Sequence, residues 1–316
     1  MSRTSPLRVA FQGEPGAFSE VAAHKLLGRG IRTVPCPTFD ALFRSVRDKA
    51  ADCILVPLEN SLAGALPRNY DLLLASRLFI VGEVVLPIAH HLIGCRGARL
   101  RDITAVYSHP VALAQCERFF AAHPRIARVA AADTAGSVRE VVTRGVPSRA
   151  ALAGAYAAAR YGGQILKRHL EDHRKNLTRF VLAFSRGRGS CALSPAGGVP
   201  PMLRFRCRRA PYKGDKLSLA LELPHRPGAL CRALQVVANA RFNLLKIESR
   251  PIAGSPWEYR FYIDVAIPRH SPTHRQGADG QSRWSHDSDA VMLWDFIHAL
   301  KGATTRLRVL GHYPTA

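Results

Sequence analysis

Strand-like and helix-like patterns alternate along residues 7–184, and this alternation is the feature that most limits how the chain can fold. Residues 7–11 alternate in polarity as a strand does, residues 39–49 place apolar side chains on one helical face, and residues 53–56 form a continuous apolar run. The alternation predicts a mostly parallel α/β sheet arranged in two lobes, the second beginning near His90. Ligands of such folds bind at the carboxyl ends of strands, so site residues are expected there.

Polar, glycine-containing clusters occur at the ends of the predicted strands. The clusters are residues 13–19 (GEPGAFS), 57–64 (PLENSLAG), 108–116 (SHPVALAQC) and 176–180 (NLTRF). In the first of them, Ser19 is predicted to cap a helix, and a strand followed by a glycine turn and a helix start presents backbone N–H groups to an anion. The pattern predicts one cleft that gathers Gly13, Asn60, Ser108, Gln115 and Thr178, whereas Thr134 opens a further helix nearby.

No signature of a cofactor or metal accompanies these clusters. The chain lacks a phosphate loop and a dinucleotide fingerprint, and His169 and His173 lack the glutamate of a helical zinc site. The neighbouring His90 and His91 lie on a predicted strand and point to opposite faces, so they cannot both bind one metal. A reaction without metal or cofactor on a small polar acid is the predicted class.

A purely structural interpretation stays open for several of these residues. Thr178 can serve only to start a strand, and Arg179 can be a surface charge or part of a structural ion pair. Ser61 and Gly64 can serve only to form a turn.

The charge and the cysteines limit the partners and the location. The 316 residues carry a net charge of +22, but the arginines are scattered, and no aromatic-interleaved basic motif is present, so nucleic-acid binding is not expected. No apolar run is long enough to span a membrane, and residues 1–6 leave no room for a signal peptide. The seven cysteines are odd in number and never form Cys-x-x-Cys, which predicts free thiols and a cytoplasmic protein.

A change of composition separates a second domain from the first. Residues 185–216 are rich in Gly, Pro and Arg, as linkers are, and a strand is possible near Leu203. The order βαββαβ predicted beyond them is typical of a ferredoxin-like fold. Its strands are expected at residues 217–223, 244–249, 257–265 and 306–310, and its helices at 227–239 and 290–300.

The ordered motifs resemble those of the prephenate dehydratase family with a C-terminal ACT regulatory domain. The resemblance covers nearly the whole chain, with two departures: Val111 stands where the family usually has Gln, and the polar loop 269–289 is longer than usual. The motifs that carry it are residues 13–19, 57–61, 108–110, 133–136 and 176–180 in the first domain, and 228–230 and 248–251 in the second.

The resemblance implies a fold, a reaction and roles for residues. It implies a two-lobed catalytic domain like that of periplasmic binding proteins at 1–184, a linker at 185–216 and the ACT domain at 217–316. Prephenate would lose water and carbon dioxide to give phenylpyruvate, with Thr178 assisting departure of the ring hydroxyl. Asn60, Ser108 and Gln115 would complete the catalytic set. The implied substrate contacts are Gly13, Gly16, Ser19, Glu59, Ser61, Thr134 and Arg179.

The second domain implies regulation by an amino acid. L-phenylalanine would bind there and inhibit the enzyme, and the domains would pair the chain as a homodimer or homotetramer. The implied effector residues are Gly228, Ala229, Leu230, Glu248, Ser249, Arg250 and Pro251. Two alternatives remain open: a dehydratase of arogenate, the aminated analogue, and a non-catalytic amino-acid sensor, against which the presence of Thr178 and its partners argues.

Overall fold

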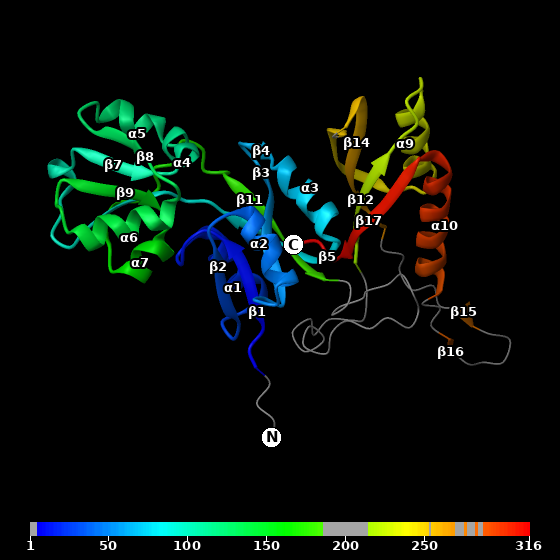
Figure 1. Ribbon diagram of the computed structural model, residues 1–316, viewed down its shortest axis with the longest axis horizontal. Coiled ribbons are helices and arrows are strands. Elements are labelled where there is room, and N and C mark those ends of the chain that lie inside the picture. Colours follow the sequence, from blue (N-terminus) through cyan, green and yellow to red (C-terminus); the bar gives the residue numbers. More distant parts are fainter. Residues whose placement is uncertain (1–4, 186–213, 253, 269–274, 277–281, 284–286) are drawn as a thin grey trace. The chain divides into compact units, whose positions relative to one another are not determined.

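The computed structural model describes residues 5–185, 214–252, 254–268, 275–276, 282–283 and 287–316, and the chain divides into two compact units (Figure 1). The first unit comprises Met1–Leu72 and Glu83–Phe184, and the second comprises Leu73–Gly82 and Ser185–Ala316.

The first lobe of the first unit is built on a sheet with the strand order β11-β3-β1-β2. Strand β1 is parallel to β2 and β3, whereas β11 is antiparallel to β3. Val9, Phe11 and Leu55 are fully buried in it, because helices α1 and α2 pack on its strands. The elements are β1 (Arg8–Gln12), α1 (Phe18–Leu27), β2 (Arg32–Cys36), α2 (Phe39–Arg47), β3 (Cys53–Asn60), β4 (Gly64–Ala65) and β11 (Leu177–Ser185). Helix α3 (Pro67–Ser76) and strand β5 (Leu78–Pro87) belong partly to the first unit and partly to the second.

The second lobe has a five-stranded sheet of order β10-β6-β9-β7-β8. One apolar cluster contains Leu92, Phe120 and Leu152, and a second contains Ile93 and Val138. Because Leu92 and Ile93 are successive residues of one strand, the two clusters lie on opposite faces of the sheet. The elements are β6 (His91–Gly94), the 3-10 helix η1 (Leu100–Asp102), β7 (Ala105–Ser108), α4 (Pro110–Ala114), α5 (Glu117–Ala122), β8 (Ala127–Ala130), α6 (Thr134–Arg144), β9 (Arg149–Ala153), α7 (Ala155–Tyr161) and β10 (Gln164–Lys167).

The prediction of a mostly parallel sheet is confirmed only in part, because the sheets of both lobes are mixed. In the second lobe, β7 is parallel to β8 and β9, but β6 is antiparallel to both β9 and β10, and β11 is antiparallel in the first lobe. The chain crosses between the lobes at β6 and returns at β11, and each crossing strand enters its sheet against the direction of its neighbours. Apolar runs do not record strand direction, so the sequence pattern could not reveal this.

Two local predictions in the first unit also need correction. Helix α1 begins two residues earlier than predicted, with Ala17 at the N-cap, so Ser19 lies buried in its first turn and does not cap it. The single helix expected from Pro110 to Phe120 is broken at Gln115 and Cys116. Its second part starts anew because the Asp172 carboxylate accepts hydrogen bonds from the backbone N–H groups of Glu117 and Arg118, at 2.8 and 3.0 Å.

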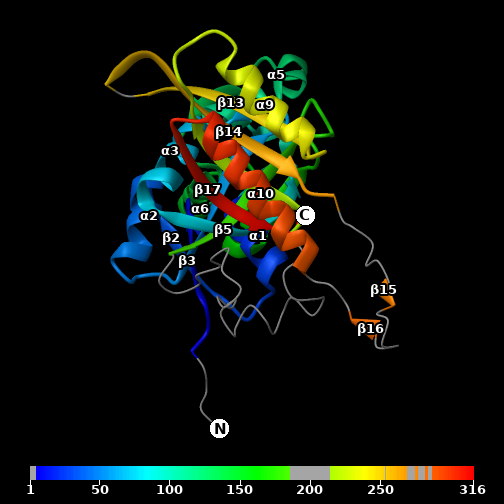
Figure 2. The ribbon, with the colours of Figure 1, turned by 90° about the vertical axis from the view of Figure 1, so that its right-hand side faces the viewer.

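The second unit contains an antiparallel sheet of order β13-β14-β12-β17 and two helices, α9 and α10, which contact each other (Figure 2). The helices and the sheet share a core in which Leu219, Ile263 and Phe296 are buried. The order βαββαβ is the predicted one, with a short hairpin added before α10. The elements are β12 (Lys216–Glu222), α9 (Ala229–Asn239), β13 (Asn243–Ile252), β14 (Ser255–Ala266), β15 (Arg275–Gln276), β16 (Ser282–Arg283), α10 (Asp287–Ala303) and β17 (Arg306–Tyr313).

Residues 73–82 belong with the second unit, although sequence analysis assigned them to the first domain. Strand β17 runs parallel to β5 with Gly311 beside Ile80, and the Arg308 guanidinium donates to the Leu74 carbonyl over 2.6 Å. A Cβ atom at position 311 would lie 2.5 Å from the Ile80 carbonyl oxygen, so this close approach requires glycine. The linker predicted at 185–216 and the possible strand near Leu203 lie almost wholly outside the described residues, as does most of the loop 269–289.

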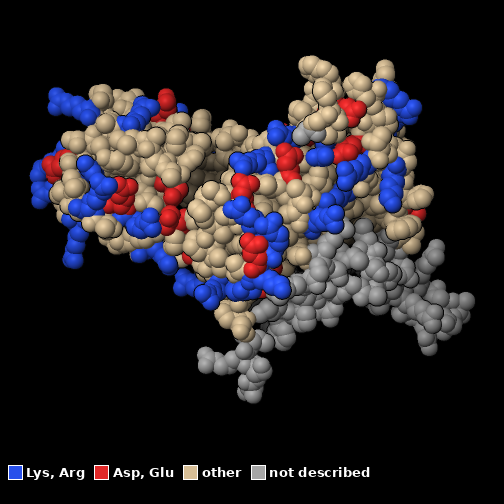
Figure 3. All heavy atoms as spheres, in the orientation of Figure 1, with Lys and Arg blue, Asp and Glu red and all other residues tan. Residues whose placement is uncertain are grey.

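Three further features are the surface charges, the lengths of the helices and the cysteines. Lys and Arg are interleaved with Asp and Glu over the face drawn in Figure 3 and form no continuous basic stripe there. Within the described ranges, no helix is both long enough and apolar enough to cross a bilayer. Five cysteines in these ranges, at positions 36, 53, 95, 116 and 231, are free thiols.

Candidate active site

A pocket of about 390 Å³ lies within the first unit and is lined from both of its lobes. Its volume falls in the range of small-molecule sites. Six residues that sequence analysis singled out line it: Gly13, Ser19, Asn60, Gln115, Thr134 and Thr178. Val111, the departure noted in the sequence, also lines the pocket, and its side chain is 47% exposed, which places it at the rim.

Thr178 and Asn60 are cross-strand neighbours at one edge of the first sheet. Because β11 is antiparallel to β3, the first residues of β11 lie beside the last residues of β3. The expectation that every cluster sits at the carboxyl end of its strand is therefore wrong for residues 176–180, which reach the same edge from the opposite direction. The Asn60 Nδ2 atom donates to the Thr178 Oγ1 atom over 2.9 Å.

The Asn60 amide is held in one orientation by the turn that follows β3. Its Oδ1 atom accepts from the backbone N–H groups of Leu62 and Ala63, at 3.0 and 2.8 Å. Backbone N–H groups can only donate, so the oxygen must face the turn and the NH₂ group must face Thr178 and Asn176. The Nδ2 atom also lies 2.7 Å from the Asn176 Oδ1 atom.

The same hydrogen-bond chain continues into the second lobe. The Asn176 Nδ2 atom donates to the Gln115 Oε1 atom over 2.9 Å, and the His90 Nε2 atom lies 3.1 Å from that oxygen. Sequence analysis considered His90 only as the start of the second lobe and as an unsuitable metal ligand. Its neighbour His91 has a different partner, since its Nδ1 atom accepts from the His169 N–H group.

Burial affects the protonation state of the His90 imidazole. The residue is 2% exposed, and burial lowers the pKa of its imidazole, although the hydrogen bond to Gln115 and the charge of Glu171 oppose this effect. The ring is therefore neutral at neutral pH. The only indication in the sequence was the pair of successive histidines, His90 and His91. That pair did not indicate which of the two lines the pocket.

Thr178 can donate a hydrogen bond into the pocket. Its hydroxyl oxygen accepts from Asn60, and its side chain is buried. In the part of the chain that the structure describes, no acceptor is assigned to the hydroxyl hydrogen. A bound molecule can supply that acceptor.

Two helix N-termini reach the pocket, one from each lobe. Phe18 and Ser19 begin α1, and the N-cap residue Ala17 offers no side-chain cap, so backbone N–H groups remain available. Thr134 begins α6 after the N-cap Asp133, whose carboxylate binds the Gly136 N–H group. Helix N-termini carry partial positive charge and suit carboxylates, and the pocket lining includes no Lys or Arg.

Five of the predicted site residues do not line the pocket. Ser108 is fully buried, and its hydroxyl donates to the Leu152 carbonyl over 2.6 Å. Ser61 donates to the Lys175 carbonyl and accepts from the Leu177 N–H group, so it fixes the chain ahead of Thr178. The Gly16 N–H group donates to the buried Glu20 carboxylate over 2.6 Å, which holds the glycine turn.

Arg179 and Glu59 form part of an ion-pair cluster away from the pocket lining. The Arg179 guanidinium lies 3.5 Å from Glu59 and 3.2 Å from Glu83, and it donates to the Tyr70 hydroxyl over 2.9 Å. Of the three interpretations of Arg179, as a surface charge, as part of a structural ion pair and as a substrate contact, this position supports the structural ion pair. Successive residues of a strand face opposite sides, so Arg179 cannot share the direction of Thr178.

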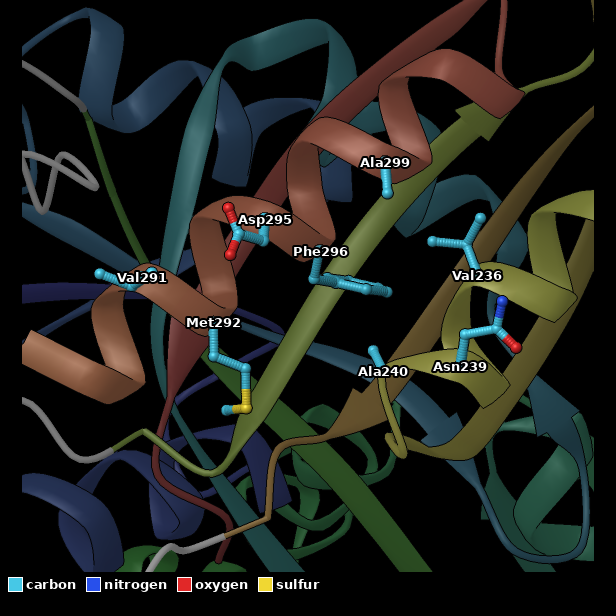
Figure 4. A pocket seen from close by; sticks show the side chains of 8 residues that line it. All are labelled: Val236, Asn239, Ala240, Val291, Met292, Asp295, Phe296 and Ala299. Carbon is cyan, nitrogen blue, oxygen red and sulfur yellow. The ribbon is translucent and has the colours of Figure 1, made fainter.

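The residues expected to bind an effector lie on two elements of the second unit. Gly228 is the N-cap of α9 with φ +74°, Ala229 is buried and Leu230 is half-buried. Glu248 and Arg250 are half-buried on β13, and Ser249 and Pro251 are exposed there. A separate apolar groove of about 690 Å³ between α9 and α10 contains none of them (Figure 4). Its lining residues are Val236, Asn239, Ala240, Val291, Met292, Asp295, Phe296 and Ala299.

Comparison with known proteins gives matches that cover most of the chain. Residues 9–186 match the model of the family "Prephenate dehydratase". The chain is 37% identical over 323 residues to arogenate dehydratase/prephenate dehydratase 2 of Arabidopsis thaliana, covering 99% of this chain and 74% of that protein. A structure of prephenate dehydratase in complex with L-Phe from Arthrobacter aurescens matches with a TM-score of 0.75 at 27% identity, covering 98% of this chain and 90% of that one. A structure described as GqqA, a novel type of quorum quenching acylases, matches with a TM-score of 0.76 at 32% identity, covering 98% of each chain.

Proposed function

This chain belongs to the prephenate dehydratase family and is a dehydratase of the prephenate and arogenate class, and we propose that it converts prephenate to phenylpyruvate, water and carbon dioxide. One observation carries the proposal beyond the family: the Asn60 amide makes the Thr178 hydroxyl an acceptor on its protein side and thereby leaves its hydrogen for the bound molecule.

The reaction needs a donor at the ring hydroxyl. The C–O bond of the ring hydroxyl breaks, and the hydroxyl leaves as water after gaining one proton. The C–C bond between the ring and its carboxylate also breaks, so that carbon dioxide leaves and the electron pair of that bond completes the aromatic ring. Aromatisation supplies most of the driving force, so the enzyme has mainly to help the hydroxyl depart. The Thr178 O–H group donates to that oxygen as negative charge develops on it, and the proton that remains in the water comes ultimately from solvent.

The two helix N-termini offer places for the two carboxylates of prephenate. Phe18 and Ser19 at the start of α1 and Thr134 at the start of α6 line the same pocket, although the Asp133 carboxylate already caps α6 and also lines the pocket, so α1 offers the less occupied helix N-terminus. The Gln115 NH₂ group adds a further donor from the pocket lining, because its oxygen is occupied by Asn176 and His90. A substrate with two anionic groups and a leaving hydroxyl fits this set of donors.

Arogenate is the second candidate substrate, because a relative that is 37% identical over nearly the whole chain is named for both activities. The two substrates differ only by a keto or an ammonium group on the side chain. The ratio of kcat/KM for prephenate and arogenate decides between them, and we expect it to favour prephenate. A ratio that favours arogenate would assign the second activity.

We further propose that residues 217–316 form an ACT domain that binds L-phenylalanine and reduces activity. The βαββαβ order supports the fold, and a relative of known structure was solved with L-Phe. Gly228 in the left-handed conformation at the start of α9 allows the backbone to approach an α-carboxylate or ammonium group closely. The effector acts only through its different affinity for two conformations of the enzyme.

We also propose that the effector site is completed by a second copy of the chain. Strand β13 pairs only with β14 among the described strands, and its Leu245 and Ile247 are 45% and 41% exposed. An edge strand of this length with apolar side chains suits pairing with a second copy, in a homodimer or homotetramer. A monomer in sedimentation analysis with phenylalanine would contradict this.

The free thiols support a cytoplasmic location.

Incubation of the purified protein with prephenate, followed by the absorbance of phenylpyruvate, is the direct test of the function. We expect turnover without added metal or nucleotide, in the presence of a chelator, and inhibition when phenylalanine is added. Absence of turnover on both prephenate and arogenate would contradict the proposal.

A further inference from the structure

The hydrogen-bond chain beneath the pocket has a single possible polarity, and it ends on His90. The polarity is set at its start, where the Asn60 oxygen accepts from the N–H groups of Leu62 and Ala63. Asn60 must therefore donate to the Asn176 oxygen. Each amide then accepts a hydrogen bond on its oxygen and donates one from its nitrogen. The direction of the bond from Asn60 to Asn176 therefore determines the direction of the bonds that follow it.

At Gln115 this polarity leaves one arrangement. The atom that receives the Asn176 NH₂ group has to be the oxygen, so the His90 nitrogen 3.1 Å from it has to carry a hydrogen. His90 is thereby the neutral tautomer with its hydrogen on Nε2. Gln115 lines the pocket, and its NH₂ group has no partner assigned to it among the described residues, so that group is available to a bound molecule.

The surroundings of the His90 Nδ1 atom favour the neutral tautomer with its hydrogen on Nε2. The Nδ1 atom is buried and has no hydrogen-bond partner within the described chain. A hydrogen on Nδ1, in the other tautomer or in the imidazolium, would be a buried donor without an acceptor, which costs about 1–3 kcal/mol or more. The ring is also held in place, since it packs edge-on against Phe18 with centroids 5.7 Å apart, and its backbone N–H group donates to the Glu171 carboxylate.

We propose that His90 is a positioning residue of this site, whose Nε2–H group locks the Gln115 amide with its NH₂ group directed at the bound substrate. The inference rests on the proposed function, because the substrate it concerns is an anion that needs donors. Without His90, the Gln115 amide loses one of the two donors that hold its oxygen inward. Rotation of that amide by a half-turn would present an oxygen to a carboxylate or keto group and repel it.

The matched variants are His90→Leu, which removes the donor, and His90→Gln, whose side-chain NH₂ group can replace the Nε2–H group. The readout is the Kd of a ring-saturated analogue of prephenate, which cannot aromatise, together with KM and kcat for prephenate. We expect His90→Leu to raise both the Kd and KM about tenfold with a smaller change in kcat, and His90→Gln to stay within about threefold of the wild type. Wild-type affinity in His90→Leu would overturn the proposal.

A double-mutant cycle separates positioning from a general effect on the fold. In the Gln115→Ala background, His90→Leu should cause no further loss of affinity, because the group on which it acts is gone. Losses that multiply would show that His90 acts independently of Gln115 and would overturn the proposal.

Nitrogen NMR on the unmodified protein keeps the test valid if His90→Leu fails to fold. We expect the His90 shifts of a neutral ring with hydrogen on Nε2 and a bare Nδ1. The other tautomer, or an imidazolium at pH 7, would overturn the proposed role of His90. If the wild type bound the analogue but did not turn over prephenate or arogenate, the proposed function would fail, and the effect of His90 on binding of the analogue could still be measured.

Discussion

Asn60 and Thr178 face each other across two antiparallel strands, and the Asn60 amide donates to the Thr178 hydroxyl over 2.9 Å. The residues are 118 positions apart in the chain. Their pairing combines a turn that fixes an amide with a strand that presents a hydroxyl. The outcome is a threonine whose hydrogen is directed away from the protein, and this direction is the basis of the proposed chemistry.

Asn60→Asp should abolish most turnover although it is nearly isosteric. One carboxylate oxygen still accepts from Leu62 and Ala63, but the other then accepts the Thr178 hydrogen, which is no longer available to the substrate. We expect kcat to fall by about 10²–10³ and the thermal midpoint to fall as well, because the same change places a carboxylate oxygen against the Asn176 oxygen. A variant with normal kcat would show that the direction of the Thr178 hydrogen does not matter.

The fold class and most of the elements could be predicted from periodicity, but strand direction could not. Residues 176–180 were assigned to the right cleft for a partly wrong reason, since they lie at the start of β11, not at the carboxyl end of a strand. Whether a hydroxyl faces a pocket also depends on the register of the sheet. Thr178 lines the pocket, whereas Ser108 is hydrogen-bonded to Leu152 and Arg179 pairs with acidic groups.

His90 illustrates what sequence patterns leave out. Its importance in the structure comes from its connection to three amides through bonded pairs that are 25 to 116 positions apart in the chain, and no local pattern contains that arrangement. The roles of Ser61, Gly16 and Glu59 as substrate contacts stay predictions without support from their positions, because these residues stabilise turns and an ion-pair cluster and do not line the pocket.

Gly311→Ala should destabilise the protein, because the new methyl group would lie 2.5 Å from the Ile80 carbonyl oxygen. Overpacking of this kind costs about 1–3 kcal/mol. The control is Gly302→Ala in α10, where a Cβ atom meets nothing within 4 Å and helix propensity should stabilise by up to about 1 kcal/mol. Urea unfolding of both variants checks the pair, and equal midpoints would contradict the contact between β17 and β5.

The same contact determines how regulation should be tested. Deletion of residues 185–316 would strip β5 of its neighbour β17 and expose Ile80, so loss of activity in a truncated chain would not by itself concern the effector. Point substitutions in the second unit are the better test.

Gly228→Ala should leave dehydratase activity intact and weaken inhibition by phenylalanine. The residue has φ +74°, where a side chain is strained, and the added Cβ atom would lie 3.1 Å from the Arg232 guanidinium. Gly145→Ala is the control for backbone strain alone, because Gly145 has φ +61° at the end of α6 and open space around it. Equal phenylalanine sensitivity in the wild type and Gly228→Ala would remove Gly228 from the effector site.

Acid should destabilise the wild type more than His90→Gln. Burial lowers the pKa of His90 in the folded protein below its ordinary value of 6.5, so below pH 6.5 the unfolded chain binds a proton that the folded chain does not. Stability contributed by the neutral ring is therefore complete above pH 6.5 and falls as the pH drops from there toward the folded pKa. Urea midpoints at pH 7.5 and 5.5 measure it, and identical acid losses in the two proteins would contradict the shift.

The rate of phenylpyruvate formation from prephenate by wild type, Thr178→Val and Thr178→Ser tests the central claim most directly. Valine keeps the shape of the side chain but removes the hydrogen that assists the departing hydroxyl, whereas serine keeps the hydroxyl with more rotational freedom. We expect kcat of Thr178→Val to fall by about 10²–10⁴ and that of Thr178→Ser to be partly retained, with both proteins folded as the wild type. A Thr178→Val enzyme with nearly wild-type kcat would contradict the account.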